Sequence, residues 1–196
     1  MEGEALACAK KNAHRRKAWI VFQDESGVSQ RPPVRRTWAP RGETPVLEHF
    51  FNWKKLSISA VLCYHWMGMS TRLLFQLREG SYDTETLIEF LEGLRHELRG
   101  EKALLIWDGL PAHKSREMKG YIAKQRKWLV VEQLPGYAPD LNPVELLWGN
   151  VKGRELANRC VDVFSELEAA VKAGLRRVGR SMKLAFSFLR HVGLSF

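Results

Sequence analysis

The sequence predicts a single α/β domain in which a mixed β-sheet is flanked by helices. Two continuous apolar runs, residues 18–23 and 103–107, have the length and composition of buried strands. An alternating pair of segments typical of a hairpin lies between them, and stretches with apolar residues at helical spacing follow. This order favours a sheet whose first and fourth strands are parallel neighbours.

The composition is that of an ordinary globular protein. The 196 residues are 45% hydrophobic and 27% charged, which suits one well-buried core. No apolar run reaches about 18 residues, and the start lacks the apolar middle of a signal peptide, so we expect a cytoplasmic protein without a membrane partner. Cys8, Cys63 and Cys160 are far apart and form no CxxC pair, which predicts reduced thiols.

The charge balance favours a polyanionic partner. Lysine and arginine total 31 against 22 acids, a formal net charge of +9 with a pI near 9.7. Such a balance is typical of proteins that bind DNA or RNA. Many basic proteins bind neither, so charge alone does not decide the partner.

The first third of the chain predicts an arm, a strand and a long loop. Residues 1–16 are basic without strong periodicity and are expected to form a loose arm. The first strand ends at Asp24, because residues 24–27 have turn chemistry. Residues 28–45 are rich in proline and arginine, which predicts a long loop. The loop is either solvated, with Trp38 tucked against the core, or an arm that contacts phosphate or a partner subunit.

The middle of the chain predicts a hairpin followed by a strand-helix-strand unit. Residues 55–65 and 72–77 are the hairpin strands, with Gly68 between them. Asp83 or Thr84 caps a helix that ends at Gly100, and its apolar stripe is Leu87, Leu91, Leu94 and Leu98. Residues 103–107 form a buried strand, and a helix over about 114–127 and a strand over 128–131 follow.

The last third is predicted to be helical. Asn142, Pro143 and Glu145 stand where a helix prefers an N-cap, a first-turn proline and an acid, and this helix continues to residue 156. A further amphipathic helix covers about 163–178. Residues 182–196 are expected to be helical, although alternation leaves a strand possible. We divide the chain into the arm 1–16, a main domain 17–160 and a C-terminal helical extension 161–196.

Three acids are expected to meet at one edge of the sheet. Asp24 and Asp108 follow neighbouring parallel strands, and Glu145 comes 37 positions after Asp108, a distance that one helix and one strand fill. Three converging carboxylates repel one another and raise a pKa unless divalent cations lie among them. Mg²⁺ prefers oxygen ligands, and a pair of ions about 3.5–4 Å apart can activate an attacking oxygen and stabilise a leaving one at phosphorus.

Each acid also has a structural interpretation. Asp24 and Asp108 are residue types that stabilise turns after strands, and Glu145 suits a capping box. Glu25 and Asp140 are rival acids, but Glu25 points to the opposite strand face from Asp24 and Asp140 lies in a turn before the helix. His113 either assists at the site, binds phosphate or is structural.

Four stretches of the sequence resemble the Tc/mariner superfamily of DDE transposases, especially its bacterial insertion-sequence branch. Residues 137–148, YAPDLNPVELLW, closely resemble the sequence around the third acid of that family. Residues 24–27 resemble the first catalytic segment, and Asp108 with residues 113–115 resembles the second. Arg36, Trp38 and Gly42 resemble the loop after the first strand. The likeness covers about residues 17–158.

The resemblance implies a ribonuclease-H-like fold with a mixed five-stranded sheet. Asp24, Asp108 and Glu145 would be catalytic and would hold two Mg²⁺ ions, with Mn²⁺ as a substitute. Water would cleave the transposon end, and the freed 3′-hydroxyl would attack target DNA. Residues 28–45 would be a clamp, and the candidate DNA contacts are Arg35, Arg36, Trp38, Arg41, His113 and Lys114. A homodimer associated with the nucleoid is expected.

The sequence departs from the family in two respects. Gly109 and Leu110 stand where the family commonly has Asn after the second acid. The family also carries helix-turn-helix modules ahead of the catalytic domain, for which the residues before Ala18 are too few. We therefore expect either the second product of a split element, which works with a separate helix-turn-helix polypeptide, or a truncated copy. The alternatives are a DNA-binding relic without activity and a ribonuclease-H-like nuclease with another substrate.

Overall fold

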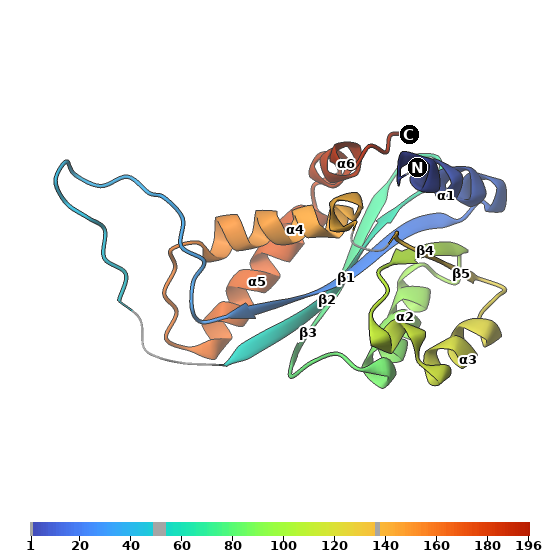
Figure 1. Ribbon diagram of the computed structural model, residues 1–196, viewed down its shortest axis with the longest axis horizontal. Coiled ribbons are helices and arrows are strands. Elements are labelled where there is room, and N and C mark those ends of the chain that lie inside the picture. The colour runs from blue at the N-terminus through green and yellow to red at the C-terminus, as the bar shows by residue number, and fades with distance from the viewer. Residues whose placement is uncertain (1, 49–53, 136–137) are drawn as a thin grey trace.

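A five-stranded mixed sheet forms the centre of the protein. The structure, a computed structural model, describes residues 2–48, 54–135 and 138–196 (Figure 1). The strand order is β3-β2-β1-β4-β5, with β1 antiparallel to β2 and parallel to β4. The strands are β1 (Trp19–Ser29), β2 (Lys55–Tyr64), β3 (Thr71–Glu79), β4 (Ala103–Trp107) and β5 (Leu129–Gln133). The prediction that the first and fourth strands are parallel neighbours is confirmed.

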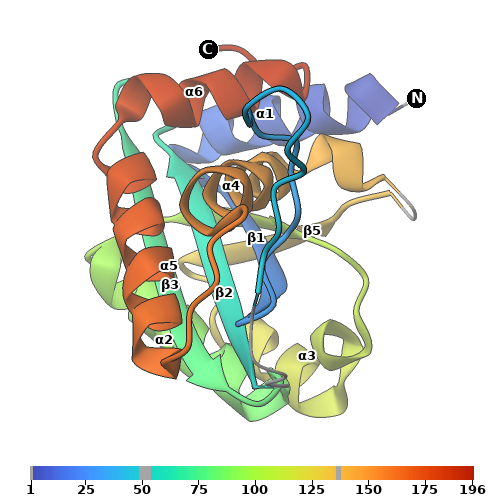
Figure 2. The same ribbon diagram turned by 90° about the vertical axis from the view of Figure 1, so that its left-hand side faces the viewer.

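Helices cover both faces of this sheet (Figures 1 and 2). One face packs against α1 (Glu2–Arg16), α4 (Pro143–Val151), α5 (Phe164–Gly179) and α6 (Met182–His191). The other face packs against α2 (Thr84–Glu97) and α3 (Arg116–Lys124). Short turns complete the chain: η1 (Pro111–Lys114), η2 (Pro139–Leu141) and the π-helical η3 (Lys152–Leu156). No helix among the described residues is long and apolar enough to cross a membrane.

Alternation along β1 decides which face each acid occupies. Ile20 and Phe22 belong to the core under α4, whereas Trp19 and Val21 belong to the core under α2 and α3. Because successive side chains of a strand point to opposite faces, Asp24 follows Phe22 toward the α4 side. Glu25 therefore points the other way, as predicted.

The first strand is longer than predicted. β1 continues past Asp24 to Ser29, because its antiparallel pairing with β2 extends to Ser29 opposite Lys55. The parallel pairing with β4 ends earlier, with Phe22 opposite Ile106. The turn chemistry of residues 24–27 is thus overridden by a partner strand, and Asp24 lies inside β1 but beyond its pairing with β4.

The N-terminal segment is a packed helix, not the loose arm that the sequence predicted. Leu6, Ala9 and Ala13 of α1 are buried at helical spacing. Two of these three residues are alanines, which give a weak hydrophobic signal and yet allow a helix to approach a core closely. The backbone N–H of Ala18 donates to the carbonyl of Ala13 at 2.9 Å and connects the helix to β1.

Most other elements agree with the prediction. Asp83 caps α2 through a reciprocal bond with Thr86, and β4 has the predicted bounds. The helix predicted from residue 114 begins at Arg116 instead, because Ser115 is its N-cap and η1 precedes it. Residues 182–191 are helical, so the strand alternative there is wrong.

The proline-rich loop extends from the body of the molecule (Figure 1) but is anchored at its start. The backbone N–H of Arg35 donates to Asn158 Oδ1, and Asn158 Nδ2 donates to the Arg35 carbonyl, both at 2.8 Å. A Cβ on Gly153 would lie 2.5 Å from the guanidinium carbon of Arg35, so a larger residue there would displace this side chain. Trp38 is fully exposed, which overturns the alternative in which it packs on the core.

The Tyr64→Phe substitution tests the contact that holds α6 on the sheet. The buried Tyr64 hydroxyl donates to the carbonyl of Ala185 at 2.9 Å. Phe keeps the ring, so we expect a loss of about 1 kcal/mol in the free energy of unfolding, measured by urea denaturation. Tyr82→Phe is the control, because its hydroxyl bonds to the Gln76 carbonyl at an exposed position. Equal losses in the two variants would contradict the importance of the buried bond.

Candidate active site

Asn142 fixes the start of α4 on β1. Its Oδ1 accepts a hydrogen bond from the backbone N–H of Val144, and its Nδ2 donates to the Gln23 carbonyl, each at 3.1 Å. The backbone N–H of Asn142 donates to the Pro139 carbonyl at 2.8 Å. This donor, which a capping box would give to Glu145, is therefore already used. The Glu145 side chain is exposed and lines a pocket, so the capping interpretation is not needed to explain it.

Trp148 joins α4 to Asp24. Its indole Nε1 donates to Asp24 Oδ2 at 2.7 Å, and the ring is buried. Trp148 follows Glu145 by three positions, which places both residues on one side of the helix. The sequence alone favours only a packing role for Trp148. A tryptophan one helical turn after the acid is the signal in the sequence that could have indicated this bond.

Burial is the main reason that the pKa of Asp24 is raised. It raises the pKa of this carboxyl to about 7, and the hydrogen bond from Trp148 opposes the shift. The neighbouring carboxylates of Glu145, Glu25 and Asp108 raise the pKa further. Repulsion among acids, which the sequence predicted, is therefore present at Asp24.

Asp108 lies directly after β4 and accepts local hydrogen bonds. Partial burial alone would raise its pKa, but His113 Nδ1, 3.0 Å from Oδ1, and the backbone N–H of Leu110, at 3.1 Å, outweigh it. Together with the charges of His113 and Lys114, they hold the pKa of Asp108 below its ordinary value. Asp108 is thus ionised more readily than Asp24.

His113 is buried between two acids. Its ring stacks on Trp107 with centroids 4.0 Å apart, and its Nε2 lies 3.5 Å from Glu25 Oε1. Burial alone would lower the pKa of His113, but the bond to Asp108 and the interaction with Glu25 raise it to about 9. Its side chain has no exposed surface, so it lies under Asp108 and not where DNA could reach it. The structural interpretation of this histidine is the one that fits its position.

The three predicted acids line one pocket. Asp24, Asp108 and Glu145 border a cavity of about 280 Å³ together with Lys114 and residues that follow β5. The acids reach it from β1, from the end of β4 and from the first turn of α4. Tyr137, the first residue of the motif over 137–148, lies outside the described residues.

The donor set suits hard cations. Carboxylate oxygens are the protein ligands that Mg²⁺ prefers, and the charges of Glu145, Glu25 and Asp108 add to burial in raising the pKa of Asp24. Within the described part of the chain, no three His, Cys, Asp or Glu side chains converge closely enough to hold a single ion. A cation bound at this pocket would therefore need water or substrate oxygens to complete its coordination shell.

Lys114 occupies the space left by the glycine after the second acid. A Cβ on Gly109 would lie 2.8 Å from Lys114 Nζ, so the missing side chain makes room for this ammonium group. Among the residues proposed to contact DNA, Lys114 lines the acidic pocket. Arg36, Trp38 and Arg41 are exposed on the loop that extends from the body (Figure 1).

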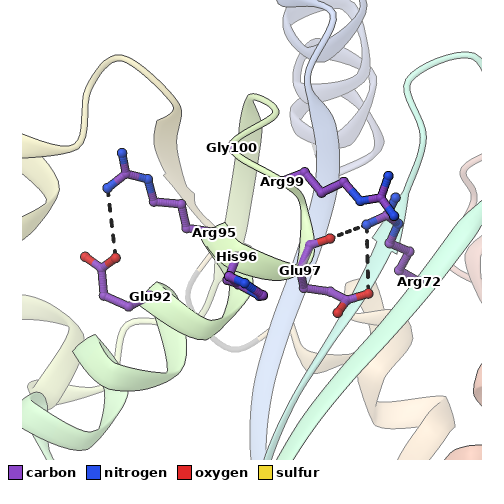
Figure 3. A pocket seen from close by; sticks show the side chains of 7 residues that line it. All are labelled: Arg72, Glu92, Arg95, His96, Glu97, Arg99 and Gly100. Carbon is purple, nitrogen blue, oxygen red and sulfur yellow. Dashed lines mark hydrogen bonds and ion pairs between the residues drawn. The ribbon is translucent and has the colours of Figure 1, made fainter.

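A second, larger pocket lies at the other end of β4, beside Gly100 (Figure 3). It measures about 880 Å³, and four of its charged residues form two ion pairs. Arg95 lies 4.0 Å from Glu92, and Arg72 lies 3.8 Å from Glu97. Because these charges are already paired and remote from Asp108, the acidic pocket is the better candidate for chemistry.

Known proteins define the fold and the family. The solved structures similar to this chain include a Mos1 strand transfer complex, with 15% identity and a TM-score of 0.59, and a mariner Mos1 paired-end complex with Mg, with 15% identity and a TM-score of 0.61. Both alignments cover 100% of this chain and 61% of the other. The Mos1 catalytic domain alone matches at 16% identity with a TM-score of 0.50, covering 100% of this chain and 93% of that one.

These likenesses confirm the class of fold, a ribonuclease-H-like α/β domain with a mixed five-stranded sheet flanked by helices. The model of the DDE superfamily endonucleases matches residues 19–168. The chain therefore belongs to the DDE superfamily endonucleases. No curated protein sequence matches it.

Asp24→Asn tests the repulsion in the pocket. A carboxyl whose pKa is raised from 3.8 to about 7 on folding stabilises the protein below pH 4, and that contribution is lost as the pH rises through 7. Asn can still accept from Trp148. Without divalent ions at pH 8, we expect the variant to be more stable than the parent by about 1–3 kcal/mol, with the gain disappearing toward pH 4.

Thermal denaturation across this pH range in the presence of a chelator measures the effect. Asp140→Asn is the control, because Asp140 is exposed and outside the pocket lining. A gain for Asp24→Asn that does not change with pH would contradict the raised pKa.

His113→Phe tests the contacts that the buried His113 makes with Glu25 and Asp108. Phe can keep the stack on Trp107 but not the bonds to the two acids. The pKa of His113 is raised from 6.5 to about 9, so its contribution is complete below pH 6.5 and is lost as the pH rises through 9. We expect a stability deficit on the order of 1–3 kcal/mol at pH 6 that shrinks by pH 9.5. A stability deficit that is equal at both pH values would contradict a charged His113 imidazole at pH 6.

Proposed function

We propose that this chain is the catalytic part of a DDE transposase of the bacterial insertion-sequence branch. It would cleave the phosphodiester backbone at transposon ends and join the freed 3′-hydroxyl to target DNA. The observation that supports this most directly is one pocket lined by Asp24, Asp108 and Glu145 in a chain of the DDE endonuclease family. Structures of Mos1 in a paired-end complex with a transposon end suggest the same substrate class for this chain.

The proposed cofactor is a pair of Mg²⁺ ions, for which Mn²⁺ can substitute. Mos1 complexes with Mg and with Mn support this choice. When bound, the ions would lower the pKa of an attacking water and neutralise charge that develops on the phosphate. Asp24, Asp108 and Glu145 would hold them, with Asp24 losing its proton as they bind.

The surrounding residues would keep these ligands in place. Trp148 orients Asp24 through a hydrogen bond, and His113 orients Asp108 from beneath. Asn142 keeps the first turn of α4, and with it Glu145, against β1. Lys114 lies at the pocket edge, where its ammonium group could contact a scissile phosphate.

The proposed assembly is a homodimer that brings two transposon ends together. The chain spans 61% of the length of the Mos1 chains in these complexes. A helix-turn-helix polypeptide is proposed to recognise the transposon ends. The loop with Arg36, Trp38 and Arg41 is proposed to clamp DNA or a partner subunit, with Asn158 anchoring its start.

Metal-dependent nicking of supercoiled plasmid tests the proposed chemistry without requiring end recognition. We expect activity with Mn²⁺ or Mg²⁺, and at least about a 100-fold loss in Asp108→Asn and in Glu145→Gln, since bound cations supply several kcal/mol of transition-state stabilisation. Asp140→Asn is the matched control and should keep its activity.

Thermal denaturation with added Mg²⁺ shows whether each variant still binds the ion. A ligand present at about 100 times its dissociation constant stabilises a protein by about 2.7 kcal/mol, and this gain should be lost with the acids. Nicking that survives both substitutions would reject the assignment of the site.

A further inference from the structure

The positive charge of the chain lies outside the residues that match the family. Residues 19–168 contain 20 of the 31 lysines and arginines and 20 of the 22 acids, so this part is formally neutral. Residues 1–18 contain five lysines and arginines against two glutamates. Residues 169–196 contain six lysines and arginines and no acid. The net charge of +9 therefore comes from the two ends of the sequence.

The fold brings one helix from each end together; of the six C-terminal cations, Lys183 and Arg190 lie on α6, and the other four lie on or directly after α5. α1 and α6 lie side by side in both views of the molecule (Figures 1 and 2). A groove of about 560 Å³ runs between α1 and the residues after α6, and Lys10 Nζ donates to the Ser195 carbonyl across it. We call this region the terminal basic surface, and it consists of Lys10, Lys11, His14 and Arg15 in the groove lining with Lys183 and Arg190 on α6.

The cations of the terminal basic surface are not neutralised by acids. Lys11, Arg15, Lys183 and Arg190 are exposed, and among the described residues none has a carboxylate within 4.0 Å. The pocket of Figure 3 differs, because its Arg72 and Arg95 are paired with glutamates. Unpaired cations arranged on one face attract a polyphosphate chain.

The terminal basic surface lies on the same side of the sheet as the acidic pocket. Ala9 and Ala13 of α1 pack into the core that contains Phe22, and Asp24 points to that face. Asn12 Nδ2 donates to Glu132 Oε1 at 2.8 Å, and the next residue, Gln133, lines the acidic pocket. A duplex lying on α1 therefore approaches the pocket past the end of β5.

We propose that the terminal basic surface binds the sugar–phosphate backbone of DNA without regard to sequence. It would hold a duplex on the side of the sheet where the acids lie. The choice of DNA rests on the proposed function, and the charge pattern supplies the independent argument. An anionic lipid surface presents similar charges, so the experiments include it.

Two variants with equal net charge test the surface. The first combines Lys11→Gln, Arg15→Gln, Lys183→Gln and Arg190→Gln. The control combines Lys119→Gln, Lys124→Gln, Arg126→Gln and Lys127→Gln, which are exposed on and after α3, on the opposite face of the sheet. Thermal denaturation checks that both remain folded.

Binding is measured by fluorescence anisotropy with a random-sequence duplex, in the presence of a chelator and over a range of salt. We expect the first variant to lose about tenfold or more in affinity at 0.1 M salt. The slope of the logarithm of its binding constant against the logarithm of the salt concentration should become shallower by about 1 for each phosphate that the variant no longer neutralises. The control should change by less than about threefold. Equal losses in the two variants would overturn the proposal.

Cys8 provides a probe that needs no substitution. It is exposed on α1, three positions before Lys11 and seven before Arg15, and therefore shares their side of the helix. Saturating DNA should slow alkylation of Cys8 but not of the partly exposed Cys160. An unchanged rate at Cys8 would contradict the proposal.

These outcomes are separable from those of the proposed function. Binding under a chelator requires no metal, so loss of nicking with intact binding would count against the catalytic proposal alone. Intact nicking with equal binding losses in both variants would count against the surface alone. The same variants are also mixed with vesicles of anionic phospholipid. If the first variant loses vesicle binding and keeps DNA binding, the surface serves a membrane and the proposal is wrong.

Discussion

The attachment of α4 to β1 is the constraint on which the candidate site depends. Asn142 bonds at once to the first turn of its own helix and to the backbone of β1. Trp148, almost two turns further along, bonds to the side chain of Asp24. With two points fixed, the helix cannot rotate or slide, and Glu145 is held beside the acids of the strands. The asparagine cap therefore contributes to the geometry of the site as well as to the stability of the helix.

Sequence patterns predicted most of the architecture because local and tertiary preferences agree there. The continuous apolar run of β4 and the cap at Asp83 needed no knowledge of their partners. The prediction was wrong where a neighbour overrode a local signal. β2 extends β1 through residues with turn chemistry, and burial against the core orders α1 despite a stripe made mostly of alanine. Such effects depend on contacts remote in sequence.

The candidate site was predictable in its acids but not in what supports them. The spacing of strands placed Asp24 and Asp108 at one edge, and the helix start brought Glu145 to the same pocket. No pattern showed that His113 would lie buried between Asp108 and Glu25, because that contact depends on the turn η1 after β4. Glu25, on the opposite face from Asp24, contacts this histidine and also raises the pKa of Asp24 through its charge. Residues that support the site through a neighbouring side chain follow no fixed sequence spacing, so the sequence alone does not predict them.

The acidic pocket lowers the stability of the protein because it buries carboxylates close to one another. Burial and like charges raise the pKa of Asp24, and divalent cations bound among these carboxylates would relieve their repulsion. We propose that Asp24, Asp108 and Glu145 jointly hold such ions, and anomalous diffraction from crystals soaked in Mn²⁺ tests this proposal. We expect anomalous peaks within coordination distance of all three carboxylates. Peaks that contact only other residues, or no peak at this pocket, would contradict the proposal.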